Sequence, residues 1–216
     1  KRVGLSDLED SGIDWATFAA SSTVKLLDKK KPRQHQIEAL AAVREGLATA
    51  DRGKMIMACG TGKTYTGSQV IARLVKEHGF TIGVVAQSHA IIENLLERVV
   101  ADGVPAAQVA KSPKDPSKDP SYTVIPKNGM AAFLGENAEH GAVVGGTAWD
   151  FSNTARVERG GLDLLVVDEA GQFSLASTIA VAAGAKRILL LGDPQQLPQV
   201  SQGAHPEPVD TSALGW

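Results

Sequence analysis

The sequence predicts an α/β fold in which a parallel β-sheet is covered by helices on both faces. Short, nearly continuous apolar runs alternate along the chain with longer segments in which apolar residues recur at helical spacing. That alternation is typical of βαβ units, whose strands are buried on both faces. Clusters of polar residues follow the ends of the apolar runs. Because ligands bind beyond the carboxyl ends of the strands in such sheets, these clusters are expected to form one site.

The elements are expected in a regular order from residue 34 onward. Ile37, Leu40, Ala41 and Leu47 recur at helical spacing and indicate the first helix. The expected helices span residues 34–50, 64–77, 89–101 and 174–183. The expected strands span residues 54–57, 81–86, 162–167 and 188–191, with a weaker one at 142–144. Together they predict one domain over residues 34–216, preceded by an N-terminal extension over residues 1–33 that could hold short helices.

An exposed loop is expected over residues 111–121, which read KSPKDPSKDPS. This stretch contains three prolines and a repeated KDPS unit, a composition that favours loops. Lys111, Lys114 and Lys118 could touch phosphates, but they alternate with acidic residues. A neutral, solvated loop is therefore favoured here.

The composition of the 216-residue chain is that of an ordinary soluble globular protein, with 43% hydrophobic and 21% charged residues. A net charge of −2 does not mark it globally as a nucleic-acid binder, although a local basic stripe can lie on a neutral domain. Cys59 is the one cysteine, which excludes a disulfide framework. With no signal peptide or membrane-length apolar run, a cytoplasmic location and no membrane partner are expected. The first residue is Lys1 rather than Met, which is consistent with a fragment.

Residues 57–64 read MACGTGKT and lie between an expected strand and an expected helix. Glycines here would let the backbone turn its amides toward phosphate oxygens, and the following helix presents its N-terminus to the same charge. Lys63 would reach the outer phosphates, and the Thr64 hydroxyl would bind Mg²⁺. A chance glycine turn is the alternative, and the flanking elements argue against it. The predicted residues of this ATP-binding P-loop are Gly60, Thr61, Gly62, Lys63 and Thr64.

Two adjacent carboxylates, Asp168 and Glu169, end the apolar run LLVVDE. In magnesium-nucleotide chemistry Asp168 would hold the metal, and Glu169 would orient and deprotonate the attacking water. A pair that only caps the next helix is the alternative, and the GTGKT motif upstream argues against it. A later strand ends in GDPQQLPQV, where Gln196 could hydrogen-bond the γ-phosphate. For that segment a plain proline-stiffened turn is the alternative.

The motifs VVDEAGQ and GDPQQLPQV together resemble motifs II and III of superfamily-one helicases, in the branch that includes the nonsense-mediated-decay helicase. VVAQSHAIIENLLERVV resembles that branch's motif Ia, and VVGGT the motif after it. The resemblance runs from about Gly60 to Trp216. It implies a RecA-like domain that binds ATP and holds single-stranded DNA or RNA, with strand contacts from Ser88, His89 and Thr147. Helix capping is the alternative for Ser88.

The segment before the P-loop resembles a different helicase class. KPRQHQIEALAAVREGL followed by DRGKMIMACGTGKT is similar to superfamily-two helicases of the restriction-enzyme type. There the glutamine that corresponds to Gln36 reads the adenine edge, and a solvated helix residue is the alternative. Both superfamilies share the GTGKT string at which the two resemblances meet. A natural or constructed recombinant is therefore one interpretation of the chain.

The resulting hypothesis is an ATP-hydrolysing motor domain of a DNA or RNA helicase or translocase. Helicases of both superfamilies place ATP between two RecA-like domains. The resemblance therefore implies a second such domain, in the same chain or another, as a partner besides single-stranded DNA or RNA. Two alternatives stay open. One is a nucleotide-binding module with little turnover, and the other is a motor subunit that serves an attached nuclease.

Overall fold

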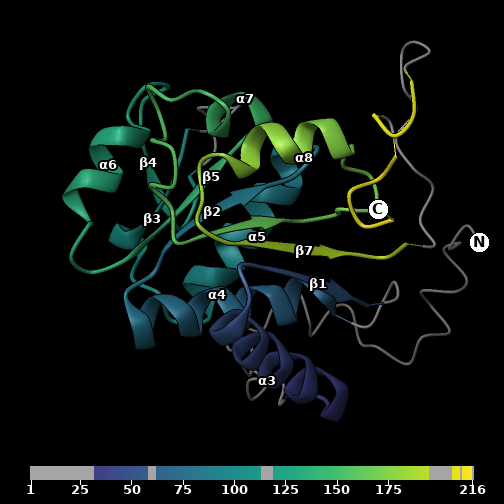
Figure 1. Ribbon diagram of the computed structural model, residues 1–216. Helices are drawn as coiled ribbons and strands as arrows, with labels where there is room; N and C mark the ends of the chain where they lie inside the picture. The colour runs from purple at the N-terminus through teal and green to yellow at the C-terminus, as the bar shows by residue number, and fades with distance from the viewer. Residues whose placement is uncertain (1–31, 58–61, 113–118, 195–205, 210, 216) are drawn as a thin grey trace, which may run out of the picture. The chain divides into compact units, whose positions relative to one another are not determined.

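The computed structural model describes residues 32–57, 62–112, 119–194, 206–209 and 211–215 (Figure 1). The described helices are α3 (Gln34–Thr49), α4 (Lys63–His78), α5 (His89–Ala101), η1 (Ala106–Gln108), α6 (Met130–Glu136), α7 (Ala148–Phe151) and α8 (Leu175–Ala182). The described strands are β1 (Arg52–Ile56), β2 (Thr81–Val85), β3 (Val109–Lys111), β4 (Thr123–Val124), β5 (Ala142–Gly146), β6 (Leu164–Val167) and β7 (Ile188–Gly192). The short helices expected near the N-terminus lie outside the described residues.

These strands form one sheet in the order β1-β7-β6-β2-β5-β3-β4, and every described pairing is parallel. Parallel strands need long crossover connections, which helices usually supply. Here α4 leads from β1 to β2 and α5 from β2 toward β3. β7, the last strand along the chain, lies between β1 and β6. The elements that follow β1 and β6 are therefore separated by the width of one strand.

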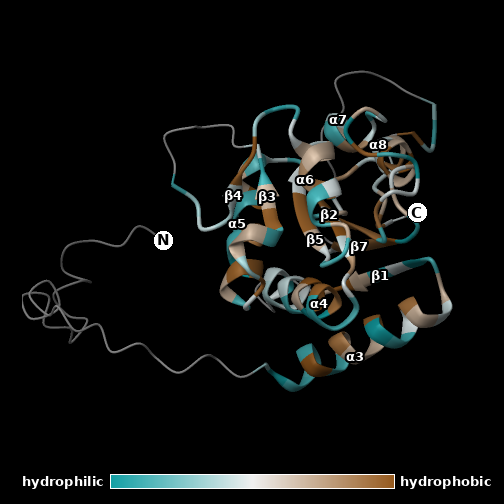
Figure 2. Cartoon of the chain, turned by 90° about the vertical axis from the view of Figure 1, so that its left-hand side faces the viewer, coloured by the Kyte–Doolittle hydropathy of each residue, from teal (hydrophilic) through white to brown (hydrophobic). Residues whose placement is uncertain are grey.

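Hydrophobic residues of the sheet alternate between two cores, one on each face. Val84 and Val166 pack with apolar residues of α3, α4 and α5. Their neighbours Val85 and Val167 pack with apolar residues of α6, α7 and α8. Successive side chains of a strand point to opposite faces, so both faces of the sheet are covered. Figure 1 shows α3 and α4 on one side of the sheet and α7 and α8 on the other, and Figure 2 shows hydrophobic residues concentrated along the strands. The predicted fold class is confirmed.

Three differences from the sequence prediction concern short segments. β3, β4, α6 and α7 were not expected, because elements of this length give too little periodicity to detect. Leu162 makes only an isolated bridge to Ala185, so β6 begins two residues later than expected. The exposed-loop prediction is wrong at its first residue: Lys111 is the end of β3 and only 1% exposed. No helix among the described residues is long and apolar enough to cross a membrane.

Candidate functional site

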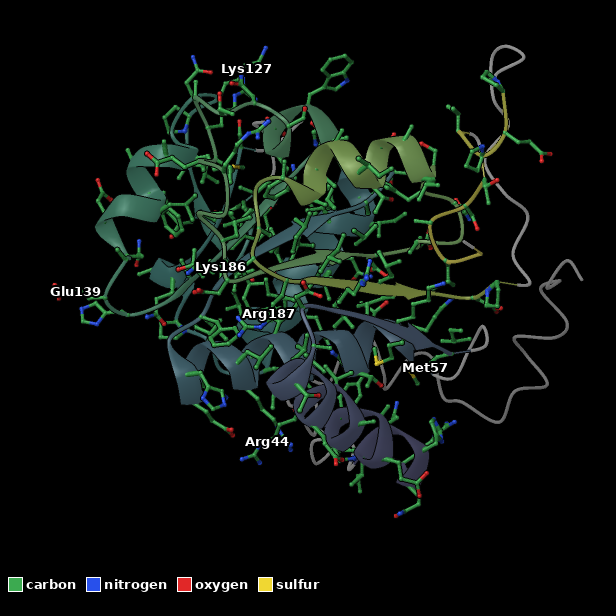
Figure 3. The ribbon with its side chains drawn as sticks, viewed as in Figure 1. Arg44, Met57, Lys127, Glu139, Lys186 and Arg187 are labelled. Atoms are coloured by element: carbon green, nitrogen blue, oxygen red, sulfur yellow. The ribbon has the colours of Figure 1, made fainter. Side chains whose placement is uncertain are left out.

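The carboxyl ends of β1, β7, β6, β2 and β5 lie at one edge of the sheet. The register pairs Ile56 with Gly192, and Val85 with both Val167 and Gly146. The P-loop, the acidic pair and the turns after β2, β5 and β7 all begin just beyond these residues. Figure 3 shows Met57 at this edge and Lys186 at the opposite end of the sheet. The structure thus brings the predicted polar clusters to one side, as the strand pattern indicated.

The described part of the P-loop begins at Gly62, which caps the N-terminus of α4 in the left-handed region, at φ 89°. Glycine adopts this backbone conformation without the steric penalty of a Cβ. Gly60 and Thr61 lie outside the described residues. Lys63 and Thr64 occupy the first turn of α4 and are half-buried. Because the first turn of a helix carries unpaired amides and a positive end, this turn is suited to an anion.

The ammonium of Lys63 is buried and has no hydrogen-bond partner in the described part of the chain. A buried charge without a partner is costly, and a functional role is one explanation for such a group in a native protein. The observation fits the role predicted for Lys63, which is to hold the outer phosphates. Phosphate oxygens would supply the acceptors that the protein does not.

The carboxyl of Asp168, directly after β6, is only 4% exposed. Burial raises its pKa to about 6, and the neighbouring Glu169 carboxylate adds to the rise. The backbone amide of Glu169, which donates to Oδ1 at 2.9 Å, and the charge of Lys63 act in the opposite direction without cancelling it. No direct ion pair between Lys63 and Asp168 is present among the described residues. A phosphate with its bound cation would complement a buried ammonium and a buried carboxyl.

Asp163 is the other described carboxyl with a shifted pKa, and it shows how a carboxylate with a structural role differs from Asp168. Burial would raise its pKa, but hydrogen bonds from Lys186 and from the Thr81 backbone amide outweigh burial and lower it. This carboxylate lies near the amino ends of the strands, and its own protein partners satisfy it. Asp168 accepts a hydrogen bond from the Glu169 amide but pairs with no cation among the described residues, and a buried carboxyl with a raised pKa is typical of a functional site.

Glu169 adopts a left-handed backbone conformation, with φ 52°, which is uncommon for a residue other than glycine. Hydrogen bonds hold the turn on either side: Gln172 N donates to Glu169 O at 2.8 Å, and Ala170 N donates to Leu191 O at 2.8 Å. Gly171 lies so close to the end of β7 that a Cβ there would be 2.6 Å from the carbonyl oxygen of Asp193. Backbone strain of this kind gathers at functional sites, where the surrounding structure fixes it.

Gln36 is buried, at 6% exposed, and contacts the P-loop. A Cβ built on Gly62 would lie 2.5 Å from Gln36 Nε2, so the side-chain amide sits directly against the glycine that precedes Lys63. The solvated alternative considered for Gln36 is therefore wrong. Its predicted contact with adenine stays a prediction. Gln196 lies outside the described residues, while Asp193, three residues earlier, is buried just past β7.

The three residues predicted to contact a nucleic-acid strand lie on the neighbouring ends of β2 and β5. Ser88 caps α5, where its hydroxyl accepts from Ile91 N at 3.3 Å. Its capping role leaves the hydroxyl hydrogen for another acceptor. Thr147 caps α7 through a capping box, and its amide and hydroxyl both donate to Asp150 Oδ2, at 2.7 and 2.8 Å. Capping thus uses both hydrogen-bond donors of Thr147. His89 is half-buried and contacts Lys111.

Two residues near this edge were not among the predicted site residues. Lys111 is buried beside His89, with its ammonium 3.0 Å from Nδ1. Trp149 is 83% exposed on α7, although its neighbour Phe151 is buried. The α7 turn that carries Trp149 is fixed by the capping box, and an ion pair joins Asp150 to Arg156. A tryptophan two residues past the GGT motif was the available signal, but its exposure depends on how α7 packs.

The fold and this edge of the sheet define a P-loop nucleotide-binding domain of the RecA-like class. The chain belongs to the AAA domain family, whose sequence model matches residues 33–211. No curated protein sequence matches it. Among the described residues no group of three or more His, Cys, Asp or Glu side chains could hold a metal. A single carboxylate with a hydroxyl and phosphate oxygens is nevertheless a usual Mg²⁺ environment.

Several solved structures share the fold. The UvsW helicase from bacteriophage T4 aligns with a TM-score of 0.56 at 13% identity, over 89% of this chain and 61% of that one. A nuclease-deletion mutant of the Type ISP restriction-modification enzyme LlaGI, in complex with a DNA substrate mimic, gives 0.55 at 18% identity, over 82% and 18% of the two chains. The ATP-dependent Type ISP enzyme LlaBIII bound to DNA gives 0.53 at 21% identity, over 87% and 14%. The chain spans only part of each of these proteins.

Proposed function

We propose that this chain is the ATP-binding and ATP-hydrolysing motor domain of a helicase or translocase that acts on single-stranded DNA or RNA. The observation that carries the nucleotide part is the buried, unpartnered ammonium of Lys63 at the N-terminus of α4, across from the buried carboxyl of Asp168. Among the described residues Lys63 Nζ has no hydrogen-bond partner and Asp168 has no cation partner, and a magnesium-bound triphosphate complements both. The proposed cofactors are therefore ATP and Mg²⁺.

Each residue of the site has a separate role in the proposed reaction. Lys63 holds the outer phosphates, and Thr64 and Asp168 hold Mg²⁺, which neutralises charge on the phosphate oxygens when bound. Glu169 orients the attacking water and accepts its proton, a role that its place in the strained turn directly after Asp168 supports. Gln196 contacts the γ-phosphate. Gln36 lies against Gly62, and this contact supports the proposal that it reads the adenine edge of a nucleotide bound there.

The proposed strand-binding surface is the edge formed by the ends of β2 and β5. Ser88 and His89 are the donors expected to contact phosphates, since both donors of Thr147 go to Asp150. Trp149, exposed on the fixed α7 turn, offers a face on which a base can stack. Gln87 Nε2 donates to Gln172 O at 3.1 Å, so a hydrogen bond links this edge to the turn after Asp168. This hydrogen bond is a direct contact through which binding of a strand could affect the turn that follows Asp168.

The finer family assignments differ on the two sides of the P-loop. The motifs after β2, β6 and β7 point to the superfamily-one branch named above, and the segment that contains Gln36 points to the restriction-type superfamily two. We propose that a second RecA-like domain, in the same protein or another, completes the nucleotide site. The fold shared with two restriction-modification enzymes favours one further role, a motor that serves an attached nuclease.

The test is the ATPase rate of the full chain with and without single-stranded DNA and RNA, together with calorimetric nucleotide binding. We expect ATP to bind, and a strand of one type to raise the rate. Lys63→Ala should remove nucleotide binding because it deletes the cation aimed at the phosphates. Lys76→Ala is the matched control on the same helix, since Lys76 Nζ donates to Asp102 O at 3.0 Å, away from the site. Equal nucleotide affinity in the unmutated chain and Lys63→Ala would contradict the proposal.

A further inference from the structure

Arg156 lies in the turn that follows α7, and hydrogen bonds fix the backbone of this turn. The Arg156 amide donates to Asn153 O at 2.9 Å, and Ala155 N donates to the Asn153 side chain at 3.0 Å. Val157, the next residue, is only 2% exposed and belongs to the same core as Phe151 of α7. The arginine is therefore held at a defined place beside α7.

Two side chains orient the guanidinium of Arg156. Asp150 Oδ1 accepts from Nη1 in an ion pair, and Asn128 Oδ1 accepts from Nη2 at 3.1 Å. A guanidinium has five N–H groups, and the described residues accept hydrogen bonds from two of them. The side chain is also 18% exposed. It therefore combines a fixed orientation with donors that a ligand can use.

This arginine is connected to the edge of the sheet where a strand contact was predicted. Thr147 directly follows β5, and its amide and hydroxyl both donate to Asp150 Oδ2. Asp150 uses its other oxygen for Arg156, so the unused donors of this network belong to the guanidinium rather than to the threonine. Trp149, which precedes Asp150 on α7, is 83% exposed. A cation and an exposed aromatic ring thus come from neighbouring segments.

We propose that Arg156 binds a backbone phosphate of single-stranded nucleic acid, with Asp150 and Asn128 as positioning residues, and makes the contact that the sequence assigned to Thr147. The inference rests on the proposed function, because it assigns one phosphate contact of the strand-binding edge. The planar fork of a guanidinium offers two parallel donors to a phosphate. Lys127, next to Asn128 and shown at the surface in Figure 3, adds a second cation for the same backbone. Phosphodiesters are common to DNA and RNA, so both strands should be bound.

An ion pair that only holds the turn after α7 would be a different use of Arg156. Arg156→Gln removes the proposed phosphate contact but also leaves Asp150 without its cation. Arg156→Gln/Asp150→Asn removes both charges, and Asn at position 150 keeps an oxygen that can accept from Thr147. Arg159→Gln is the matched control, since Arg159 is exposed three residues later and has no ion pair among the described residues.

The first measurement is the affinity of the full chain for fluorescein-labelled oligo(dT) and oligo(U) of equal length, across a range of salt concentrations. Arg156→Gln should weaken binding by roughly threefold to thirtyfold, because one charged hydrogen-bonded contact is lost. The slope of log affinity against log salt should become shallower by about 0.7, the effect of one phosphate contact on a single strand. Arg159→Gln should leave that slope unchanged. A parental slope in Arg156→Gln would overturn the inference.

The second measurement compares the remaining variants, with urea unfolding in parallel. Arg156→Lys keeps the charge and loses the fork, so it should retain the salt slope and lose less affinity than Arg156→Gln. Arg156→Gln/Asp150→Asn should unfold close to the parental midpoint and still bind more weakly than the parent. Parental affinity in the double variant would reduce Arg156 to an ion-pair partner and sink the inference alone. Absence of binding to either oligonucleotide by the unmutated chain would instead refute the strand-binding part of the proposed function.

Discussion

At the scale of single residues, the ionised carboxyl of Asp168 destabilises the folded chain in the absence of nucleotide and metal. Its folded pKa of about 6 lies above its ordinary value of 3.8, so the folded state disfavours the charged form. The contribution of the Asp168 carboxyl to the free energy of unfolding is therefore greatest below pH 3.8. It falls as the pH rises from 3.8 to about 6 and stays low at higher pH. Asp168→Asn should therefore raise the unfolding free energy at pH 8, by up to roughly 3 kcal/mol, in buffer free of nucleotide and metal.

Urea unfolding at pH 8 and at pH 4.5, with a chelator present, measures this effect. The gain should shrink at the lower pH, where Asp168 is already largely protonated in the folded chain. The same variant should lose Mg²⁺-dependent nucleotide binding, so stability and function would move in opposite directions. An Asp168→Asn chain that is less stable than the parent at pH 8 would show that the carboxylate is satisfied within the protein.

Glu169 gives a second prediction at this scale. Glu169→Gln keeps the shape of the side chain and the left-handed turn, but an amide cannot accept a proton. We expect nucleotide affinity to stay within about twofold of the parent, since no phosphate contact is removed, and hydrolysis to slow by about 10² or more. Single-turnover hydrolysis under saturating Mg²⁺ is the measurement. A variant that hydrolyses ATP at the parental rate would remove Glu169 from the role of base.

At the scale of elements, one glycine fixes the corner where α4, β2 and β5 meet. Gly141 precedes β5 with φ 78°, and a Cβ there would be 2.7 Å from the backbone carbon of Gly79, the residue that caps α4. Gly160→Ala is a matched control, since Gly160 has a similar φ of 64° but nothing within 4 Å of its Cβ position. Both variants incur about 1–2 kcal/mol of left-handed strain.

Only Gly141→Ala also drives a methyl group into backbone that cannot move aside. It should therefore lose about 1–3 kcal/mol more unfolding free energy than Gly160→Ala, the usual penalty of overpacking. Denaturant unfolding of the two variants side by side measures the difference. Equal losses of unfolding free energy in the two variants would mean that the backbone around Gly141 shifts to accept the methyl group at no cost. Because β5 leads to the turn proposed to bind a strand, we also expect weaker oligonucleotide binding in Gly141→Ala alone.

Long elements could be predicted from the sequence, and short ones could not. The periodicity of α5 gave its bounds correctly, and the apolar runs gave β2 and β7 to within one residue. Lys111 shows why the remainder was missed. Its neighbours in sequence are polar and rich in proline, which indicates a loop, whereas the acceptors that allow its burial come from α5, 18 and 22 residues earlier. Local composition carries no information about such distant partners.

The candidate site was predictable for a different reason. Motifs that follow strand ends must meet at one edge if the sheet is parallel. The sequence alone therefore predicts that Lys63 and Asp168 lie on the same edge. The pattern could not predict how buried these side chains are or which hydrogen bonds they make, because both depend on how the helices pack on the two faces of the sheet. The unpaired ammonium of Lys63, the contact of Gln36 with Gly62 and the exposure of Trp149 emerge only in three dimensions.

At the scale of the whole molecule, the 216-residue chain should bind ATP but hydrolyse it slowly and unwind no duplex. In the proposed site Lys63 is the cation that holds the ground-state phosphates. Transition-state charge on the γ-phosphoryl group needs a further cation, and an arginine finger is worth about 10³–10⁵ in rate, or roughly 4–7 kcal/mol of barrier. Two described arginines are engaged elsewhere: Arg156 pairs with Asp150, and Arg98 lies over the ring of Tyr65.

Unwinding also needs two domains that close and open on the strand with each ATP cycle, and the described residues from Gln34 on form one compact unit. ATPase and duplex-unwinding assays across a range of protein concentrations test the prediction. A second copy could supply an arginine from outside, so a rate per molecule that climbs steeply with concentration would indicate self-assembly. A monomeric preparation that unwinds a tailed duplex with ATP would contradict the prediction that this chain needs a second domain to complete its site. Addition of a separately expressed second RecA-like domain should raise hydrolysis by orders of magnitude, and mutation of that domain's arginines should abolish the gain while leaving ATP binding by Lys63 unchanged.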